Sequence, residues 1–387
     1  MKKYFLYILL IYVIFINIRV YADESDLRTP FFKPTLENKA KPKYVRAIHL
    51  TGWSAGSRAY RKKLDKLLRE TELNTLVIAV KEYNGEVYIP GVKKAVEFGA
   101  YTRAMPAISK YIQKLKEKGV YSVARIVLFK DDIAAKYNPE WAVKNKFGRV
   151  WEDNKKQSWL DPYNREAWNY NFSVADKCVE LGFEEIQFDY IRFPSDGDIE
   201  QCQYSKPHSS TTAVAILLEF LKEARKRYTV NKGIPISIDV FGLTTSAKTD
   251  LGIGQILTEM AKYVDYVCPM VYPSHYNEGV YGIENPDADP YNIIRRAIYD
   301  ARECLGSNSA KLRPYLQDFT LDFPYTEKEV LAQIQMCYDN DVPEWTLWNP
   351  KSRYTETVFK PEEYSDIYEK TRTVISSSTF VTELIEK

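Results

Sequence analysis

The stretch Phe183-Glu184-Glu185-Ile186-Gln187-Phe188-Asp189-Tyr190-Ile191-Arg192-Phe193-Pro194 decides how the chain is expected to fold. It has the character of an apolar strand that ends in a carboxylate, followed by Arg192 and a Pro194-Ser195-Asp196-Gly197 turn. A carboxylate at the end of a buried strand is costly to desolvate unless it has partners. Asp189 is therefore either a structural residue paired with Arg192 or a functional residue, and the rest of the chain bears on that choice.

Strand-like and helix-like segments alternate along residues 44–350. The expected strands are 45–50, 75–80, 121–129, 183–189, 234–240, 266–272, 313–319 and 344–350. Eight strands separated by helices over about 300 residues is the pattern of a single (β/α)₈ TIM barrel. A doubly wound open sheet is the alternative, but no glycine-rich nucleotide-binding motif follows any strand. We expect a linker or arm over 23–43 and a closing polar helix and tail over 351–387.

The N-terminal residues have the pattern of a secretory signal. Met1-Lys2-Lys3 precedes an apolar run from Tyr4 to Ile18, and Val20-Tyr21-Ala22 offers a cleavage site. These features predict a signal peptide over 1–22 and a secreted, periplasmic or cell-envelope protein. An uncleaved N-terminal anchor is the alternative, because the apolar run approaches the ~17 residues that can cross a bilayer. Membrane attachment is then expected only through this segment.

Composition argues against several classes of partner. The formal net charge is only +2, which gives no electrostatic basis for binding nucleic acid. The five cysteines are widely spaced without a CxxC motif, so no disulfide framework or zinc site is indicated. With only three histidines in the chain, we predict no metal centre and no cofactor.

Ionisable and aromatic side chains gather at the C-terminal ends of the predicted strands, where the βα loops of a barrel form its active site. Asp189 and Arg192 end the fourth strand, and Asp239 ends the fifth. The other candidates at strand ends are Trp53 after the first, Lys81 and Glu82 after the second, Tyr272 and His275 after the sixth, Gln317 and Asp318 after the seventh, and Trp348 after the eighth.

This arrangement favours glycoside hydrolysis, in which one carboxyl group protonates the leaving oxygen while another acts as nucleophile or activates water. Asp189 and Asp239 end neighbouring strands, so their carboxyl groups are expected to face one another. Glu82 is the third candidate, and the acid stays open between Asp239 and Glu82. Arg192 or Lys81 would keep one carboxylate ionised. Flat faces for sugar rings would come from Trp53, Trp151, Trp159 and Trp348.

Several motifs also resemble a known family, the glycosyl-hydrolase domain family called domain of unknown function 4015. They are Arg46-Ala47-Ile48-His49-Leu50-Thr51-Gly52-Trp53, Val77-Ile78-Ala79-Val80-Lys81-Glu82-Tyr83-Asn84-Gly85, Trp159-Leu160-Asp161-Pro162-Tyr163, Gln187-Phe188-Asp189-Tyr190-Ile191-Arg192-Phe193-Pro194 and Pro269-Met270-Val271-Tyr272-Pro273-Ser274-His275-Tyr276. The resemblance covers roughly residues 44–350. It implies a TIM barrel distantly similar to the α-amylase-type hydrolases.

The resemblance also implies roles for particular residues. In those relatives the nucleophilic Asp ends strand four and the acid ends strand five, which carries onto Asp189 and Asp239. The amylase-type acid is normally Glu, and the shorter Asp here leaves the stereochemical outcome open. Trp159 and Asp161 would lie near the substrate. A barrel that binds carbohydrate without cleaving it is the alternative function, and a different enzyme on the same scaffold is a third.

Overall fold

Eight parallel strands close into a barrel in the order of the chain, which confirms the predicted fold class. The computed structural model describes residues 41–361, so the predictions for 1–22, for 23–40 and for 362–387 lie outside the described residues. The strands are β1 (Arg46–Leu50), β2 (Thr75–Lys81), β3 (Tyr121–Val127), β4 (Glu185–Asp189), β5 (Ile236–Phe241), β6 (Tyr266–Met270), β7 (Tyr315–Gln317) and β8 (Trp345–Trp348). Each lies inside or within a residue of its predicted segment.

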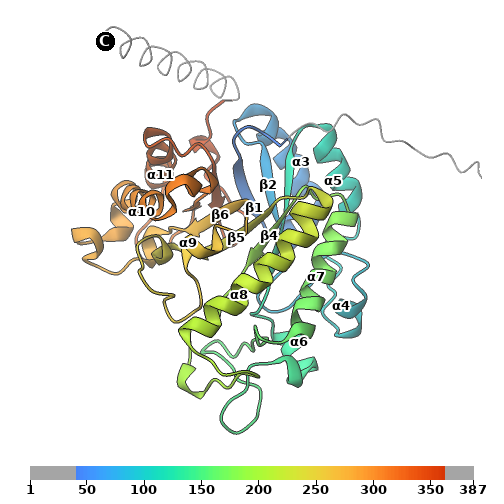
Figure 1. Ribbon diagram of the computed structural model, residues 1–387. Coiled ribbons are helices and arrows are strands. Elements are labelled where there is room, and N and C mark those ends of the chain that lie inside the picture. The colour runs from blue at the N-terminus through green and yellow to red at the C-terminus, as the bar shows by residue number, and fades with distance from the viewer. Residues whose placement is uncertain (1–40, 362–387) are drawn as a thin grey trace, which may run out of the picture. The chain divides into compact units, whose positions relative to one another are not determined.

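Helices connect the strands and surround them, as Figure 1 shows for α5, α7 and α8 on one flank and for α10 and α11 on another. They are α2 (Gly52–Gly56), α3 (Arg58–Glu70), α4 (Lys93–Glu97), α5 (Ile108–Glu117), α6 (Asp132–Tyr137), α7 (Arg165–Glu180), α8 (Ser210–Arg225), α9 (Leu257–Met260), α10 (Pro290–Leu305) and α11 (Glu327–Asp339). Side-chain caps define several starts, including a capping box between Ser209 and Thr212 at α8. Asp131 caps α6 by accepting a hydrogen bond from the Ala134 backbone N–H.

The strands bury both faces, and the two faces differ in character. Ile48, Ile78 and Ile126 belong to the large apolar core between the strands and the helices. The opposite faces point into the barrel, where Val45, Ala47, Val77, Tyr121 and Val123 form a small apolar cluster. This two-sided burial explains why β1 to β3 are nearly continuous apolar runs.

Polar side chains fill much of the remaining barrel interior. Arg313, just before β7, is fully buried and donates hydrogen bonds to Glu185 at 2.7 Å and to Glu344 at 3.0 Å. One layer further along the barrel, the Tyr315 hydroxyl donates to Gln187 Oε1 at 2.6 Å. The barrel interior therefore contains successive layers of hydrogen-bonded polar side chains, which continue toward the C-terminal ends of the strands.

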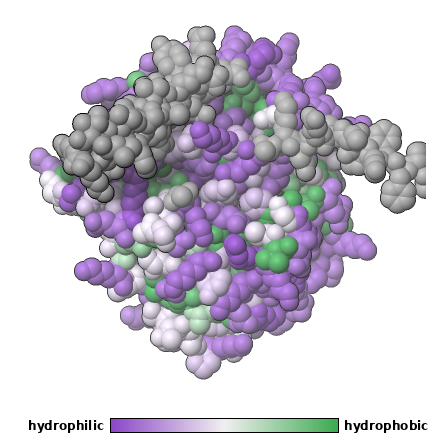
Figure 2. Space-filling model, turned by 45° about the horizontal axis from the view of Figure 1, so that its top comes forward, coloured by the Kyte–Doolittle hydropathy of each residue, from purple (hydrophilic) through white to green (hydrophobic). Residues whose placement is uncertain are grey.

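The molecular surface is largely hydrophilic on the face shown in Figure 2, where hydrophobic side chains form small separate groups. Across residues 41–361, no helix combines the length and apolar character needed to span a bilayer.

Candidate active site

Three charged side chains from β3, β4 and β5 meet inside the C-terminal mouth of the barrel. Asp189 is the last residue of β4, and Phe188 pairs with Ile238 of β5, so Asp189 and Asp239 lie side by side at the same height. Arg125 points into the barrel from β3, where it is paired with Gln187. Because side chains alternate along a strand, an inward Arg125 and an inward Asp189 and Asp239 follow directly from this register.

The Arg125 guanidinium connects three carboxyl groups. Its Nη2 donates a short hydrogen bond to Asp189 Oδ2, its Nη1 lies 3.4 Å from Glu82 Oε2, and its Nε lies 3.6 Å from Asp239 Oδ2. Burial acts to lower the pKa of Arg125, but Asp189, Glu82 and Asp239 together raise it well above its usual range. Arg125 is thus a permanent cation shared among more acids than it can neutralise.

Asp239 is the carboxyl group that holds a proton most readily. It is almost completely buried, and its Oδ1 accepts no hydrogen bond from the described residues. Burial, followed by the charge of neighbouring Asp189, raises the pKa of Asp239 well above the usual value for an aspartate. A protonated Asp239 beside an ionised Asp189 is the division of labour that a general acid and a nucleophile or base require.

Asp189, in contrast, has a partner for each of its carboxylate oxygens. Besides the ion pair with Arg125, its Oδ1 accepts a 2.6 Å hydrogen bond from the Tyr190 backbone N–H. Tyr190 has φ of 49°, in the left-handed region that residues with a side chain seldom adopt. Such strained backbone is found at sites that fix a functional group. Here it turns a backbone donor toward the Asp189 carboxylate and the Tyr190 ring toward the cavity.

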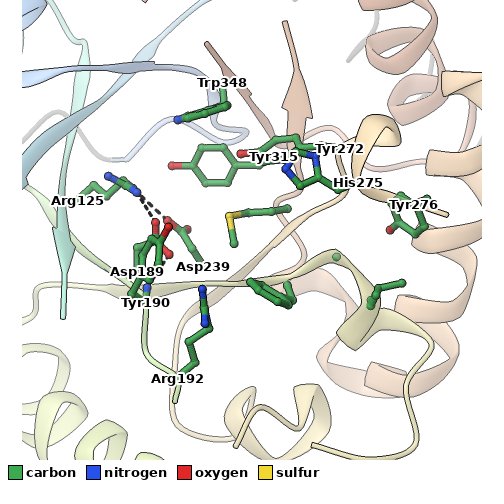
Figure 3. Close-up of a pocket in the computed structure, with 14 residues that line it drawn as sticks. Arg125, Asp189, Tyr190, Arg192, Asp239, Tyr272, His275, Tyr276, Tyr315 and Trp348 are labelled. Carbon is green, nitrogen blue, oxygen red and sulfur yellow. Dashed lines mark hydrogen bonds and ion pairs between the residues drawn. The ribbon is translucent and has the colours of Figure 1, made fainter. Parts of the chain in front are cut away.

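A cavity of about 370 Å³ opens over these carboxyl groups (Figure 3). Trp348 and Tyr272 form one wall, with their rings stacked at 5.5 Å between centroids and an interplanar angle of 27°. The lining residues are Arg125, Asp189, Tyr190, Arg192, Asp239, Phe241, Gly242, Leu243, Met270, Tyr272, His275, Tyr276, Tyr315 and Trp348. A sugar ring could therefore stack on the aromatic wall of this cavity, with the two carboxyl groups beside it as acid and base.

The comparison that decides the family is the match of residues 47–354 to a family model described as "Putative glycosyl hydrolase domain". The chain belongs to this family. It is the family that the sequence motifs resemble, and the match spans nearly the whole barrel, including Arg125, Asp189 and Asp239. A comparison with curated proteins gives no significant match.

Solved structures of glycosidases share the fold of this glycosyl-hydrolase domain. The PgaB glycoside hydrolase domain from Bordetella bronchiseptica is 14% identical over 80% of this chain and 95% of its own, with a TM-score of 0.58. The α-L-fucosidase isoenzyme 2 from Paenibacillus thiaminolyticus is 13% identical over 85% of this chain and 49% of its own, with a TM-score of 0.55. Apart from these glycosidases, the chain is similar in sequence to a hypothetical protein from Ruminiclostridium thermocellum of known structure, with 34% identity over 50% of this chain and 97% of that protein and a TM-score of 0.45.

Six of the residues expected in the site of this glycosyl-hydrolase domain line the cavity, and a seventh lies directly behind it. The six are Asp189, Arg192, Asp239, Tyr272, His275 and Trp348. Glu82 contacts Arg125 but does not line the cavity. Burial raises the pKa of Glu82, and the nearby Arg125 opposes that effect.

Lys81 requires a correction, because it points away from the cavity. A register shift between Ala79 and Lys81 turns its side chain toward the helix layer. There it is fully buried, forms an ion pair with Asp131 at 2.7 Å and donates to Asn171 Oδ1 at 3.0 Å. Lys81 therefore anchors β2 to the start of α6 and to α7, and it is not placed to contact a substrate.

Gln317 and Asp318 are also held by structural contacts instead of lining the cavity. The Gln317 amide donates to Asp287 at 3.3 Å and accepts from the Ser274 backbone N–H at 3.1 Å. The Asp318 carboxylate accepts from the backbone N–H and the hydroxyl of Thr355, at 2.8 and 2.9 Å. Both side chains tie together the loops that follow β6, β7 and β8.

The remaining expected contacts from loops are placed elsewhere. Trp159 is buried beneath the cavity wall and donates to Asp153 at 3.3 Å. Asp161 is buried and accepts hydrogen bonds from two backbone N–H groups, at Tyr163 and Ser205. Trp53 is 60% exposed on α2 and does not line the cavity. Trp159 thus supports the cavity wall without lining it, and Asp161 stabilises a loop. Trp53 could contact only a ligand that extends beyond the cavity.

Sequence reasoning missed Arg125, the residue that connects the three acids. The predicted site residues lie at the ends of strands, whereas Arg125 lies inside the run Val123-Ala124-Arg125-Ile126-Val127. A lone cation in a strand that is otherwise apolar demands a buried acidic partner, and that signal could have identified it. Aromatic and apolar lining residues such as Phe241, Met270 and Tyr315 carry no comparable signal.

The described part of the chain contains no cluster of side chains that could bind a metal ion. Within residues 41–361, no three His, Cys, Asp or Glu side chains are grouped so as to hold a metal ion.

Proposed function

We propose that this glycosyl-hydrolase domain cleaves a glycosidic bond in a polysaccharide or oligosaccharide, with Asp239 as the acid and Asp189 as the nucleophile or base. The observation that carries the proposal is the contrast between the two carboxyl groups at one guanidinium. Asp189 is ion-paired with Arg125, while Asp239 is buried with a free oxygen and a raised pKa. The family and the glycosidase fold support the same chemistry.

The proposed reaction begins with the sugar ring in the cavity, against the wall formed by Trp348 and Tyr272. Asp239 donates its proton to the glycosidic oxygen as the bond to the anomeric carbon breaks. Asp189 then either attacks that carbon or takes a proton from the water that attacks it. Arg125 holds the Asp189 carboxylate in position in both cases. Glu82 is the weaker candidate for the acid, because it lies behind Arg125 and does not line the cavity.

The test compares Asp189→Asn and Asp239→Asn with wild type on a panel of glycans and aryl glycosides. Both variants should stay folded and lose roughly 10²–10⁴-fold in kcat/KM on natural glycans, the contribution of a positioned acid or base. An aryl glycoside with a good leaving group needs little protonation, so it should recover much of the loss in Asp239→Asn and none in Asp189→Asn. Asp322→Asn, which changes an exposed carboxylate, is the matched control.

Unchanged turnover in either active-site variant rules out the role proposed for that residue. The anomer released first, observed by NMR, distinguishes direct attack by Asp189, which retains the configuration, from activation of water, which inverts it.

A barrel that binds carbohydrate without cleaving it is the second candidate. The ion pair between Arg125 and Asp189 favours it, since a carboxylate held by a guanidinium can have a purely structural role. Against it, both acids contact the same guanidinium and therefore lie close together, as an acid and base pair requires. Binding of an oligosaccharide with no turnover on the whole panel would establish this second function.

The location of the substrate is part of the proposal. Residues 1–22 have the signal-like pattern described above, so we propose a substrate outside the cell or in its envelope, with no nucleic-acid partner and with any membrane attachment limited to this segment. N-terminal sequencing of the mature protein after cell fractionation tests this: a mature chain that begins at Asp23 in an extracytoplasmic fraction is expected, and an intact Met1 in the cytoplasm contradicts it.

A further inference from the structure

Arg192 brings a second cation to the same cavity, and its environment differs from that of Arg125. It follows β4 by three residues and is only 8% exposed, yet it lines the cavity. Figure 3 shows its guanidinium end directed toward the space over the Asp189 and Asp239 carboxyl groups. A cation in this position faces whatever ligand occupies the cavity.

The protein supplies Arg192 with few partners of opposite charge. Its Nη1 donates to the Phe193 carbonyl at 3.0 Å and to the Ser195 hydroxyl at 3.1 Å, and the Tyr190 side chain is a further hydrogen-bond partner of the guanidinium. Within residues 41–361, no carboxylate oxygen lies within 4 Å of its guanidinium nitrogens. Burying a cation without an ion pair is costly. Burial accordingly lowers the pKa of Arg192, an effect that Tyr190 and Asp189 partly offset.

Aromatic faces surround the guanidinium and fix its orientation. Its carbon lies 5.0 Å from the Trp159 ring centroid, 4.8 Å from that of Tyr190 and 4.5 Å from that of Phe241. Rings at these distances attract a cation but neutralise no charge. The hydrogen-bond partners of the guanidinium are a carbonyl and two hydroxyl groups, all uncharged, so its positive charge is left for a ligand in the cavity. A planar guanidinium can pair with the oxygens of one acidic group.

The charges that line the cavity also favour an acidic ligand. With Asp239 protonated, they are two guanidinium groups and the Asp189 carboxylate, and His275 is neutral because burial lowers its pKa. Arg125 is already contacted by Asp189 and Glu82, so Arg192 is the cavity cation that lacks a carboxylate partner among the described residues. The nearby Asp189 carboxylate disfavours a doubly charged ligand, so a singly charged group suits the cavity best.

We propose that Arg192 binds a singly charged acidic substituent of the sugar, the carboxylate of a uronic acid or a sulfate ester. The proposed substrate class is therefore an acidic glycan. This inference rests on the proposed function for the location of the sugar, but it concerns binding and can be tested without turnover.

Matched pairs of oligosaccharides test the inference on the full chain. Asp239→Asn, which removes the acid and keeps the arginine, is titrated calorimetrically with oligogalacturonate and its methyl ester, with oligoglucuronate and its methyl ester, and with sulfated and unsulfated galactan oligosaccharides. The acidic member of at least one pair should bind roughly 10–100-fold more tightly than its neutral partner, the contribution of a hydrogen-bonded ion pair. The uronate and sulfate pairs distinguish the two chemical sources. Equal affinity within every pair, or no binding by any acidic member, overturns the inference.

Variants of Arg192 assign the preference to this residue. Arg192→Met in the same Asp239→Asn background should remove the preference for the acidic sugar, whereas Arg192→Lys should keep part of it. Arg295→Met, which removes an exposed arginine of α10, should change neither affinity. Circular dichroism and thermal unfolding establish that the variants are folded. If Arg192→Met is unfolded, the esterified sugars in the first experiment still decide the question.

The outcomes separate this inference from the proposed function. Turnover of neutral glycans by wild type, with no preference for acidic ones, overturns the inference and leaves the hydrolase assignment intact. Binding of acidic sugars through Arg192 without turnover of any glycan supports the inference and rejects the hydrolase assignment.

Discussion

The barrel contains two arginine–carboxylate clusters, one at each end of β4, and they use the same chemistry differently. The lower cluster surrounds Arg313 and includes Glu185, the first residue of β4. Its charges balance, because Arg313 and Lys41 face Glu185 and Glu344, with Lys41 bound to Glu344 at 3.0 Å.

Hydrogen bonds complete the lower cluster around Glu185. The carboxylate accepts from Ser237 at 2.6 Å and from Tyr121 at 3.1 Å, in addition to Arg313 at 2.7 Å. A buried ion pair with its remaining oxygen sites occupied is a structural element.

The upper cluster surrounds Arg125 and includes Asp189, the last residue of β4. Here one guanidinium faces three carboxyl groups, and Asp239 has an oxygen without a partner. Burial and the charge of Asp189 raise the pKa of Asp239, and Asp239 lines the cavity where a ligand can reach it. Both clusters are buried and use the same residue types, so the difference between the lower cluster and the upper one, for which we propose acid–base chemistry, lies in the balance of their charges.

The comparison is tested most strongly by removing each arginine. Arg125→Met should lower kcat/KM by roughly 10²–10⁴-fold, the contribution of a positioned base, because Asp189 then loses the hydrogen-bonded cation that holds its carboxylate in place. Arg313→Met should leave kcat of the folded protein within a few fold but lower the free energy of unfolding by about 3–5 kcal/mol, since Glu185 and Glu344 lose their buried partner. Steady-state kinetics and urea unfolding measure the two effects.

The pair of arginine variants serves as its own control. A large loss of kcat in Arg313→Met, with stability preserved, would show that the lower cluster also takes part in catalysis. An Arg125→Met enzyme with wild-type kinetics would remove the upper cluster from the mechanism.

The second prediction concerns the pH dependence of stability. In the unfolded chain Asp239 ionises near pH 3.9, whereas in the folded protein its raised pKa keeps it protonated to higher pH. The folded state therefore binds more protons above about pH 4, and stability falls as the pH rises toward the folded pKa. Asp239→Asn removes this penalty, so its free energy of unfolding should exceed that of wild type at pH 8 by on the order of 1 kcal/mol.

The stabilisation by Asp239→Asn should vanish near pH 4, where asparagine and a protonated aspartic acid are alike. Urea unfolding of both proteins at pH 4, 6 and 8 measures the difference, and Asp322→Asn provides the exposed control. A constant difference across this range, or a loss of stability at pH 8, contradicts a protonated Asp239 in the folded enzyme.

The fold and the central acids were predictable because each has a local signal in the sequence. Eight apolar runs that alternate with segments of helical periodicity predicted the barrel. Two consecutive predicted strands each end in an aspartate, and this pattern predicted that Asp189 and Asp239 lie in the site. A strand that ends at the barrel mouth carries its last inward residue into the site whatever its neighbours are. The positions of Asp189 and Asp239 in the sequence were therefore sufficient to predict that both side chains lie at the barrel mouth.

The other site residues depended on details that the sequence does not display. One irregularity after Ala79 turned Lys81 out of the barrel. The Gln317 side chain forms hydrogen bonds with Asp287 and Ser274. These residues are distant in the sequence, and only the fold brings them next to Gln317. Arg125 lies in the middle of a strand, and its role appears only when three other strands close around it. Register and partner choice are tertiary properties, which explains why these positions were not predicted.

The smallest effect is expected at Glu82, the outermost acid of the upper cluster. Its Oε2 lies 3.4 Å from Arg125 Nη1, outside the cavity lining. Glu82→Gln removes one competitor for the guanidinium, so Arg125 should favour ionised Asp189 more strongly and shift the acidic limb of the pH–rate profile to lower pH. We expect kcat to change by roughly threefold to tenfold, well below the ~10²–10⁴-fold contribution of a general acid. A loss in Glu82→Gln as large as that in Asp239→Asn, recovered on an aryl glycoside with a good leaving group, would instead identify Glu82 as the proton donor. In that case the excess of acid around Arg125 would still mark the catalytic cluster, but the donated proton would come from Glu82, just after β2, and Asp239 would only influence the pKa of Glu82.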